Sequence, residues 1–408
     1  MKHTALPLAL CTAALGLPLT GQSAAPMPSP EQMWEIIQQQ QQEIEALKRQ
    51  QQATERKADA ADEKAEAAVD AVESDSSGSG GWAERTRIGG YGELHYYNID
   101  ASDSANDVKE LDFKRFVLFA GHEFTDDIRF FSEIELEHSI AGEGQNGEFE
   151  LEQAYLEFDL RDNLQARGGL FLLPVGILNE THEPNTFYGV ERNDVESIII
   201  PATWWAGGAG LSGRHANGIS WDLAVHEGLR MDTTSFRVRD GRQKTSEARA
   251  DDLAWSGRLR YTGIPGLELA ASANYQTDAS QVGGDGLDSG LLLETHLVYE
   301  KGPFGLRALY ARWDFDGAAV AAADADRQTG WYLEPSYRVR SDIGLYARYE
   351  DVAAARSQDR FDQWEIGVNY WPHPDVVIKA DYRSRDHDLA AEAGRDFDAF
   401  DLGIGYQF

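Results

Sequence analysis

Cysteine is almost absent from this sequence of 408 residues, and the single one, Cys11, lies in an apolar run near the start. Residues 1–25 combine a basic start, that apolar run and a small-residue end, which is typical of a secretory signal peptide. The mature chain is then expected to have no cysteine, which excludes disulfides, a thiolate nucleophile and cysteine-ligated metal sites. A lipid-modified Cys11 is disfavoured because Leu10 stands where a small residue is expected.

Long apolar runs and positive charge are also scarce. Beyond the first twenty residues, no stretch approaches the roughly 18 consecutive apolar residues that a membrane-spanning helix needs. A membrane role would therefore have to use β-strands. The chain has 37 Lys and Arg against 69 Asp and Glu, a formal net charge of −32. Such a surface repels phosphate backbones, so nucleic acid is not expected as a partner.

Residues 26–72 are predicted to form a coiled-coil helix. From Met33 to Val72, apolar and small neutral residues recur at alternating spacings of four and three. A lone amphipathic helix is the alternative, but the Gln and Ala residues on this seam would stabilise a single helix poorly. Self-association is therefore favoured. Residues 73–84, which include the stretch ESDSSGSGG, are predicted to be a flexible linker.

The remaining segment, residues 85–408, is predicted to form about 16 strands. Short alternating segments follow one another, separated by turn signals. The connectors alternate between tiny ones, such as TDD and KGP, and longer polar ones. The strands are expected near 85–99, 111–124, 128–140, 148–160, 164–173, 203–215, 219–229, 251–262, 266–277, 289–300, 304–315, 327–340, 343–352, 362–371, 375–386 and 397–408.

Alternating short and long connectors, with an even number of strands, are typical of an outer-membrane barrel. Each strand has one apolar face: in QWEIGVNYW, Trp364, Ile366 and Val368 lie opposite Glu365. Lipid outside and water inside would suit both faces, and closure pairs every edge strand. The predicted fold class is thus all-β: a transmembrane antiparallel β-barrel of about 16 strands, preceded by an N-terminal coiled-coil helix.

Three segments carry finer predictions. The last one, FDAFDLGIGYQF, is expected to be the closing strand, with glycines that permit curvature. Register is uncertain in LDFKRFVLFAGHEF, where both faces contain apolar residues. In EFELEQAYLEFDL the alternation slips near Gln153, which indicates a β-bulge.

Several ordered blocks carry a family resemblance. GYGELHYYN, LDFKRFVLFAGHEFTDDIRFFSEIELEHS, ELEQAYLEFDL, LFLLPVGILNETHEPNTFYGVERNDVE and IIPATWW resemble porins of the phosphate-selective porin O and P family, through most of Gly89 to Gly228. The second half resembles the family in its strand rhythm. The resemblance implies a 16-stranded trimeric barrel whose eyelet is narrowed by the third external loop. The coiled coil would fit such a trimer as a periplasmic stalk.

The third long connector, residues 174–202, is the candidate constriction. Its apolar islands, Phe187, Tyr188 and Ile198 to Ile200, favour packing into the lumen. The alternative is a solvated acidic surface loop. The candidate constriction residues are Glu180, His182, Glu183, Tyr188, Glu191, Arg192 and Asp194.

The alternation of inward and outward residues along the strands also predicts that several charged side chains point into the lumen. Opposed basic and acidic walls would create a transverse field that orients solutes and sorts ions. The alternative is that these charges simply hydrate a wide pore. The predicted basic wall is Arg258, Arg260, Arg338, Arg340, Arg348, Lys379, Arg383 and Arg385, and the predicted acidic wall is Glu133, Glu135 and Glu137.

The acidic constriction argues against strong phosphate selectivity, which calls for Lys and Arg at the narrowest point. The fourth long loop, residues 230–250, is rich in basic side chains, so an external anion funnel stays open as an alternative. Its basic residues are Arg230, Arg237, Arg239, Arg242, Lys244 and Arg249.

No enzyme, cofactor or metal is predicted. His182 stands beside Glu183, but no second histidine lies at ligand spacing, and a lone loop histidine is generally solvated. His122, His138 and His296 have no evident serine partner. The stretch GAGLSG lacks the lysine of a phosphate-binding loop.

The sequence therefore predicts an outer-membrane porin, with the stalk in the periplasm. It would allow passive diffusion of ions and small hydrophilic solutes, with anions such as phosphate among the candidates. Expected partners are outer-membrane lipid, two further copies in a homotrimer, and the cell wall through the stalk. The alternative is a structural tether, in which the coiled coil links a non-conducting barrel to the cell wall.

Overall fold

The computed structural model describes residues 81–284 and 286–408. The predicted signal peptide, the coiled coil and the start of the linker lie outside the described residues. Among the described residues, no helix has the length and apolar character needed to cross a membrane.

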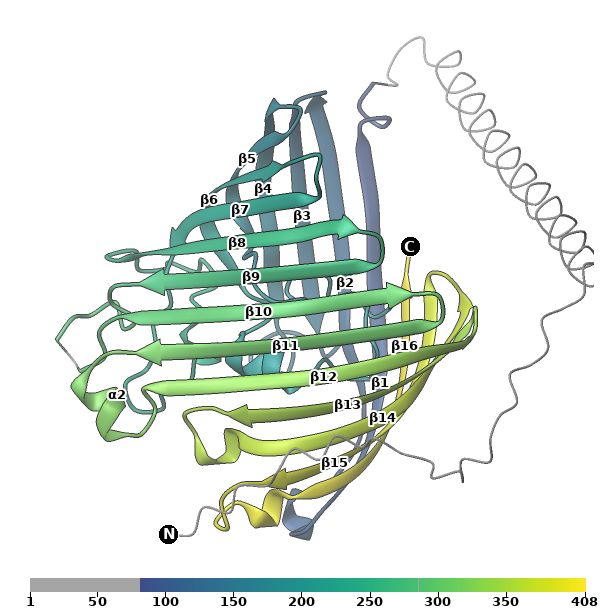
Figure 1. The fold of residues 1–408 in the computed structure, drawn as a ribbon, viewed down its shortest axis with the longest axis vertical. Coiled ribbons are helices and arrows are strands. Elements are labelled where there is room, and N and C mark those ends of the chain that lie inside the picture. Colours follow the sequence, from purple (N-terminus) through teal and green to yellow (C-terminus); the bar gives the residue numbers. More distant parts are fainter. Residues whose placement is uncertain (1–80, 285) are drawn as a thin grey trace, which may run out of the picture. The chain divides into compact units, whose positions relative to one another are not determined.

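Sixteen strands form a closed antiparallel barrel in which each strand pairs with the next and β16 pairs with β1 (Figure 1). This confirms the predicted barrel and its strand number. The strands are β1 (Thr86–Ala101), β2 (Val108–Thr125), β3 (Ile128–Glu137), β4 (Phe149–Arg161), β5 (Leu164–Leu172), β6 (Trp205–Arg214), β7 (Ile219–Glu227), β8 (Leu253–Ile264), β9 (Leu267–Gln276), β10 (Gly290–Lys301), β11 (Phe304–Phe315), β12 (Arg327–Arg340), β13 (Ile343–Ala353), β14 (Arg360–His373), β15 (Val376–His387) and β16 (Phe397–Gln407).

Connectors define two ends of the barrel. Those after even-numbered strands have two to four residues, and those after odd-numbered strands have six to 32. We call these the short-turn end and the long-loop end. Short helical elements lie in the long loops: η1 (Ser104–Asn106), η2 (Val195–Ile199), η3 (Arg239–Gly241), α2 (Ala318–Ala322), η4 (Ser357–Asp359) and η5 (Ala393–Arg395).

The wall is apolar outside and polar inside. Trp364 and Ile366 are 57% and 56% exposed, whereas Glu365 between them is 1% exposed. The closing strand behaves in the same way, since Leu402 and Ile404 face outward while Asp401 is buried. A wall with apolar side chains outside and charged side chains buried inside is suited to a lipid environment.

Both segments of uncertain register contain irregularities. Glu133 pairs with Gln153 but Ile134 pairs with Leu151, so Glu152 is an extra residue. This confirms the predicted bulge in β4. In β2, residues 113–114 together stand opposite a single residue of β1, which shifts the inward parity from Asp112 to Arg115. That shift explains why both faces of this strand look apolar in the sequence.

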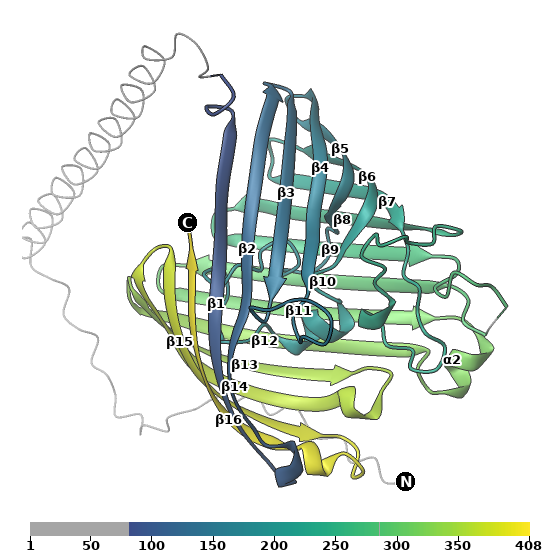
Figure 2. The same cartoon turned by 180° about the vertical axis from the view of Figure 1, so that it is seen from behind.

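The connector between β5 and β6, residues 173–204, lies inside the barrel, and we call it the inner loop. Trp313 Nε1 of β11 donates to the Ile199 carbonyl at 2.9 Å, and Arg115 Nη2 of β2 donates to the His182 carbonyl at 3.0 Å. Contacts to strands so far apart around the ring require the loop to cross the interior, where Figure 2 shows it behind β1–β5. Val190, Val195 and Ile199 of the loop are fully buried.

Glycines on the inner wall let the loop approach closely. A Cβ at Gly405 of β16 would lie 2.4 Å from Pro184, and one at Gly344 of β13 would lie 2.4 Å from the Tyr188 hydroxyl oxygen. The sequence pattern predicts that the glycines of the last strand permit curvature. The structure adds a packing reason, because any larger residue at position 405 would collide with the inner loop.

Candidate functional site

One flank of the inner loop is fixed to the barrel wall by hydrogen bonds. The Val190 backbone N–H donates to Asp381 at 2.6 Å, and Asn369 Nδ2 donates to the Phe187 carbonyl at 3.2 Å. Tyr332 donates its hydroxyl to Glu196 at 2.9 Å. These partners belong to β12, β14 and β15, so this part of the inner wall is covered by the loop.

Three predicted acidic constriction residues are paired with cations. Glu180 forms an ion pair with Arg258, and Asp194 forms one with Arg385. Their negative charge is therefore largely offset where it would face a solute.

The third, Glu191, attaches the loop to β1 and β2. Its carboxylate lies 3.3 Å from Lys114 Nζ and 3.1 Å from His95 Nδ1, and it accepts a hydrogen bond from Tyr97. Burial by itself raises the pKa of Glu191, but Lys114, His95 and Tyr97 together lower it well below its ordinary value. Glu191 is thus a charged structural contact at neutral pH.

The other constriction candidates differ in their surroundings. Glu183 is half-buried and has no ion pair among the described residues. Tyr188 packs against Tyr346 with ring centroids 5.2 Å apart. Arg192 donates to the Thr203 hydroxyl at 3.0 Å and has no carboxylate partner in the described part of the chain. Burial, reinforced by nearby Arg115, lowers the pKa of Arg192.

His182 is buried, so its interpretation as a solvated loop histidine is wrong. Only 2% of the residue is exposed. Its Nε2 atom lies 3.6 Å from a Glu133 oxygen and 3.7 Å from a Glu152 oxygen. Spacing along the chain could not show this, because the two glutamates come from β3 and β4 and the histidine from the inner loop.

Four residues of the predicted basic wall lie beneath the inner loop. Arg348 is held by Glu334 at 3.1 Å and by Glu365. Lys379 is buried, with its Nζ 3.6 Å from the centroid of the Phe187 ring. The other two are paired with carboxylates: Arg383 with Asp401 and Arg385 with Asp194.

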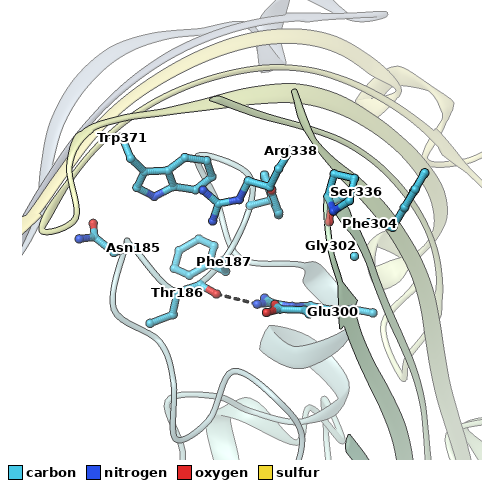
Figure 3. A pocket seen from close by; sticks show the side chains of 13 residues that line it. Asn185, Thr186, Phe187, Glu300, Gly302, Phe304, Ser336, Arg338 and Trp371 are labelled. Atoms are coloured by element: carbon cyan, nitrogen blue, oxygen red, sulfur yellow. Dashed lines mark hydrogen bonds between the residues drawn. The ribbon is translucent and has the colours of Figure 1, made fainter. Parts of the chain in front are cut away.

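The remaining four lie elsewhere. Arg258 and Arg260 line a cavity in the lumen. Arg338 and Arg340 lie at the short-turn end, where the Arg338 guanidinium carbon is 3.8 Å from the centroid of the Trp371 ring (Figure 3). Arg340 is exposed and pairs with Asp342 at 3.0 Å.

The predicted acidic wall is also divided. Glu133 and Glu135 are 3% and 2% exposed beside the inner loop, and Glu137 is half-buried nearer the long-loop end. The predicted basic and acidic walls therefore do not face each other across open space in this structure, because the inner loop packs against both.

Open space in the lumen lies on the other flank of the inner loop. A cavity of about 510 Å³ is bounded by strands β4 to β11, mostly in their short-turn halves, and by the inner loop. We call it the lumen cavity. Its charged lining residues are Glu157, Arg167, Glu180, Arg214, Asp222, Arg258, Arg260, Glu268 and Arg307.

A second cavity, of about 240 Å³, adjoins the lumen cavity, since Thr186 and Arg307 line both. Arg307 Nη2 donates to the Thr186 carbonyl at 2.7 Å, the bond drawn in Figure 3. Phe187 faces Arg338 and Trp371 across this space (Figure 3). Cations and aromatic faces thus border the short-turn end of the lumen.

The fourth long loop also packs inward. Arg239 Nη1 donates to the Ala202 carbonyl at 2.5 Å, and Arg242 donates to the Thr203 carbonyl. Lys244 pairs with Glu148 at 2.9 Å and with Glu150 of β4. Three of the residues predicted for an external anion funnel therefore contact the inner loop or the wall, whereas Arg230 and Arg249 are exposed.

Sequence reasoning missed several charged residues of the lumen. Arg167 and Arg307 line the lumen cavity, and strand alternation could have found them. Glu152 was missed because the bulge changes its direction. Arg115 was missed because the irregularity in β2 hides its inward parity.

Comparisons with known proteins agree with this architecture. Residues 65–408 match the family model described as Gram-negative porin. An uncharacterized protein of Aquifex aeolicus (strain VF5) is 30% identical over 364 residues, which cover 79% of each chain.

Solved porin structures share the fold. The anion-selective porin from Comamonas acidovorans has a TM-score of 0.57 at 13% identity, covering 79% of this chain and 99% of that one. Salmonella typhi OmpF in complex with daunomycin has a TM-score of 0.56 at 14% identity, covering 79% and 97%. At such identities the similarity shows the fold alone. The finer resemblance to phosphate-selective porins O and P stays a prediction.

The closed barrel with a loop folded inside it and the family match over most of the sequence support the same conclusion. They support a channel located in the outer membrane, and the chain belongs to the Gram-negative porin family.

Proposed function

We propose that this porin is a passive diffusion channel for ions and small hydrophilic solutes that favours anions. The observation that carries the proposal is the charge balance in the lumen cavity. Its lining contains five arginines and four carboxylates, and the carboxylates are all paired whereas three arginines are not.

The paired carboxylates come first. Arg258 binds both Glu180 and Asp222, the latter at 2.9 Å. Glu157 pairs with Arg129 at 2.7 Å, outside the lining. Glu268 lies 3.9 Å from Arg260 and 3.3 Å from His296. These pairings lower the attraction of the cavity for cations.

Three arginines leave positive charge facing the cavity. The guanidinium carbon of Arg167 lies 4.4 Å from the centroid of the Phe171 ring, and Arg307 donates to the backbone carbonyl of Thr186. Arg214 is exposed, and none of the three has a carboxylate partner among the described residues. Uncompensated cations in a narrow, protein-lined space concentrate anions there.

This interpretation reverses the expectation from the acidic inner loop. Glu180, Glu191 and Asp194 are acidic in the sequence, but each is paired in the structure. The net charge of −32 describes the whole chain rather than the lumen cavity. Phosphate is one anion of the class that the arginines would attract, so selectivity for it is a separate question.

The reversal potential of the full mature chain in a planar bilayer with a KCl gradient tests the proposal. We expect an anion-leaning potential, reduced severalfold in permeability ratio by the triple variant Arg167→Gln, Arg214→Gln and Arg307→Gln. The matched control replaces three exposed arginines outside the cavity: Arg249, Arg327 and Arg395. A cation-selective wild type, or an equal effect of the control, would contradict the proposal. Adding phosphate then tests whether it competes with chloride.

The same recording separates the channel from the tether. A barrel that only anchors a stalk would pass no ions, whereas an open pore conducts on the nanosiemens scale. Contact of the stalk with the cell wall is compatible with both proposals and stays a prediction.

A homotrimer is proposed for the assembly. An apolar hollow of about 550 Å³ on the outer wall contains the small residues Gly257 and Ala273 between exposed Leu223 and Trp255. Small residues on a lipid-facing wall allow close approach of another chain. An OmpT structure from Vibrio cholerae, similar in fold with a TM-score of 0.51, is described as a trimer form.

A further inference from the structure

A buried cluster of three ionisable side chains joins the inner loop to the wall. Glu133 of β3, Glu152 of β4 and His182 of the inner loop each offer one atom, and these atoms all lie within 4.8 Å of one another. The three residues are 1% to 3% exposed. The cluster lies outside the lumen cavity and has no part in the proposed anion preference.

Two atoms of this cluster have no hydrogen-bond partner. They are His182 Nε2 and Glu152 Oε2, both buried. The other ring nitrogen of His182 lies 3.3 Å from the Asn179 carbonyl oxygen, which can only accept. Nδ1 therefore carries a proton. Nε2 faces two carboxylates, so a positive charge, either a second proton or a metal ion, is required between these atoms.

The distances favour a metal ion over a proton in that position. The Nε2–oxygen distances are 3.6 Å to Glu133 and 3.7 Å to Glu152. A charge-assisted hydrogen bond from a protonated imidazole would be about 2.7–2.9 Å long. Two ligands bound tetrahedrally to one ion at about 2.1 Å lie about 3.4 Å apart. The observed Nε2–oxygen distances are close to this separation of two ligands of one ion.

Local charge also calls for a cation. Glu135, whose Oε1 has no hydrogen-bond partner, adds a third buried carboxylate beside the cluster. Arg115 lies 3.9 Å from Glu135 but is already engaged with Glu93. Several carboxylates buried side by side are costly unless enough positive charge offsets them.

The surroundings position the donors. Gln153 Nε2 donates to the second oxygen of Glu133 at 2.6 Å and fixes that carboxylate. The bulge in β4 turns Glu152 inward beside Gln153, where regular alternation would place only one of them. Bulges often re-aim side chains in this way, and partners of this kind orient metal ligands.

We propose that Glu133, Glu152 and His182 bind one first-row divalent cation, with Zn²⁺ the best match. Imidazole and carboxylate ligands suit Zn²⁺, and three protein ligands leave a position for water. The ion would link the inner loop to β3 and β4 and so hold the loop in place inside the barrel. Because the site is buried, the ion would enter as the loop closes during folding.

The test uses the untagged mature chain, unfolded with a chelator and refolded in detergent with or without Zn²⁺. We expect about one zinc per chain by mass spectrometry, and a higher unfolding temperature with zinc than without it. His182→Ala and the isosteric Glu152→Gln should each weaken binding by about tenfold or more. X-ray absorption at the zinc edge should show one imidazole among oxygen ligands.

The matched control is His296→Ala. His296 is also buried between two glutamates, but at hydrogen-bond distances of 2.7 Å to Glu294 and 3.3 Å to Glu268. This variant should keep its zinc. A refolded wild type without zinc would overturn the proposal even if a variant fails to fold. Zinc retained in His182→Ala, or lost equally from His296→Ala, would overturn it as well.

Discussion

The inner wall of the barrel has two regions whose charges have different roles. In the covered region, β12 to β16 and β1 to β3, the inner loop lies over the wall, and Arg348, Arg383 and Arg385 are bound to carboxylates. In the open region, β4 to β11, the wall borders the lumen cavity, and Arg167 and Arg214 have no carboxylate partner among the described residues. Both regions are rich in inward-facing arginine.

The difference shows that inward orientation does not by itself make a charge available to a solute. Covered arginines pair with carboxylates of neighbouring strands or, for Arg385, of the inner loop, and their charge is cancelled at short range. Open arginines contribute little to stability but shape the potential that an ion meets. Four predictions test this division, from the largest expected effect to the smallest.

Removing a covered arginine should be strongly destabilising. Arg348→Ala leaves Glu334, Glu350 and Glu365 buried without their shared cation, which we expect to cost about 3–5 kcal/mol. Unfolding in urea measures this loss. Arg340→Ala is the control, because Arg340 is exposed and its pair with Asp342 should contribute no more than about 1 kcal/mol. Equal losses of unfolding free energy in both variants would contradict the different roles of covered and exposed arginines.

Glu191→Gln should weaken the loop attachment in a pH-dependent way. Its charged contacts with Lys114 and His95 should contribute about 1.5–3 kcal/mol at neutral pH. The folded pKa of Glu191 lies below the unfolded value of about 4.3. The stabilisation is therefore complete above that pH and is lost as the pH falls towards the folded pKa.

Unfolding free energies of wild type and Glu191→Gln between pH 7 and pH 3 measure this dependence. Their difference should stay constant from about pH 6 to about 4.3 and shrink below it. A difference that disappears between pH 7 and 5 would be inconsistent with a depressed pKa.

Gly405→Ala tests the close contact between the covered wall and the inner loop. The new Cβ would lie 2.4 Å from Pro184, and we expect a cost of about 1–3 kcal/mol. A shifted loop should also change the single-channel conductance. Gly121→Ala is the control, because a Cβ there would have only one neighbour within 4 Å, a carbonyl oxygen of Phe130 at 3.7 Å. If both variants behave like wild type, the loop does not pack as described.

The smallest change in stability should come from the open region. Arg214→Gln should shift the reversal potential towards cations while leaving the unfolding free energy within about 0.5 kcal/mol of wild type. Arg385→Gln should lower the unfolding free energy by more than this and leave the reversal potential nearly unchanged, because Arg385 is held by Asp194 and Gln363. A larger selectivity change in Arg385→Gln than in Arg214→Gln would show that the covered arginines also act on ions.

Much of the barrel could be predicted from sequence because the alternation of residues within each strand identifies its outward and inward faces. The bounds of β11 and β12 agree residue for residue with the prediction, and the bulge was located to within one residue of Gln153. These features depend on alternation and turn residues, which are local properties. The inward packing of the inner loop was also predicted, from its apolar islands.

The site was less accessible to prediction because its partners are distant in sequence. Asp194 and Arg385 are 191 residues apart, and Glu191 and His95 are 96 apart. Acidic residues on the inner loop predicted a negative constriction, but their pairing depends on which strands the loop covers. His182 was expected in solvent for the same reason, although it lies buried between two strands.

The sequence by itself determined the all-β barrel, its 16 strands, their inward and outward faces and the position of one bulge. Periodicity and turn chemistry are sufficient for these features, because each strand must match lipid on one side and a polar interior on the other. Only the tertiary structure decided which inward charges are cancelled and which remain. Electrostatic compensation depends on distance in space, and the path of the inner loop sets those distances.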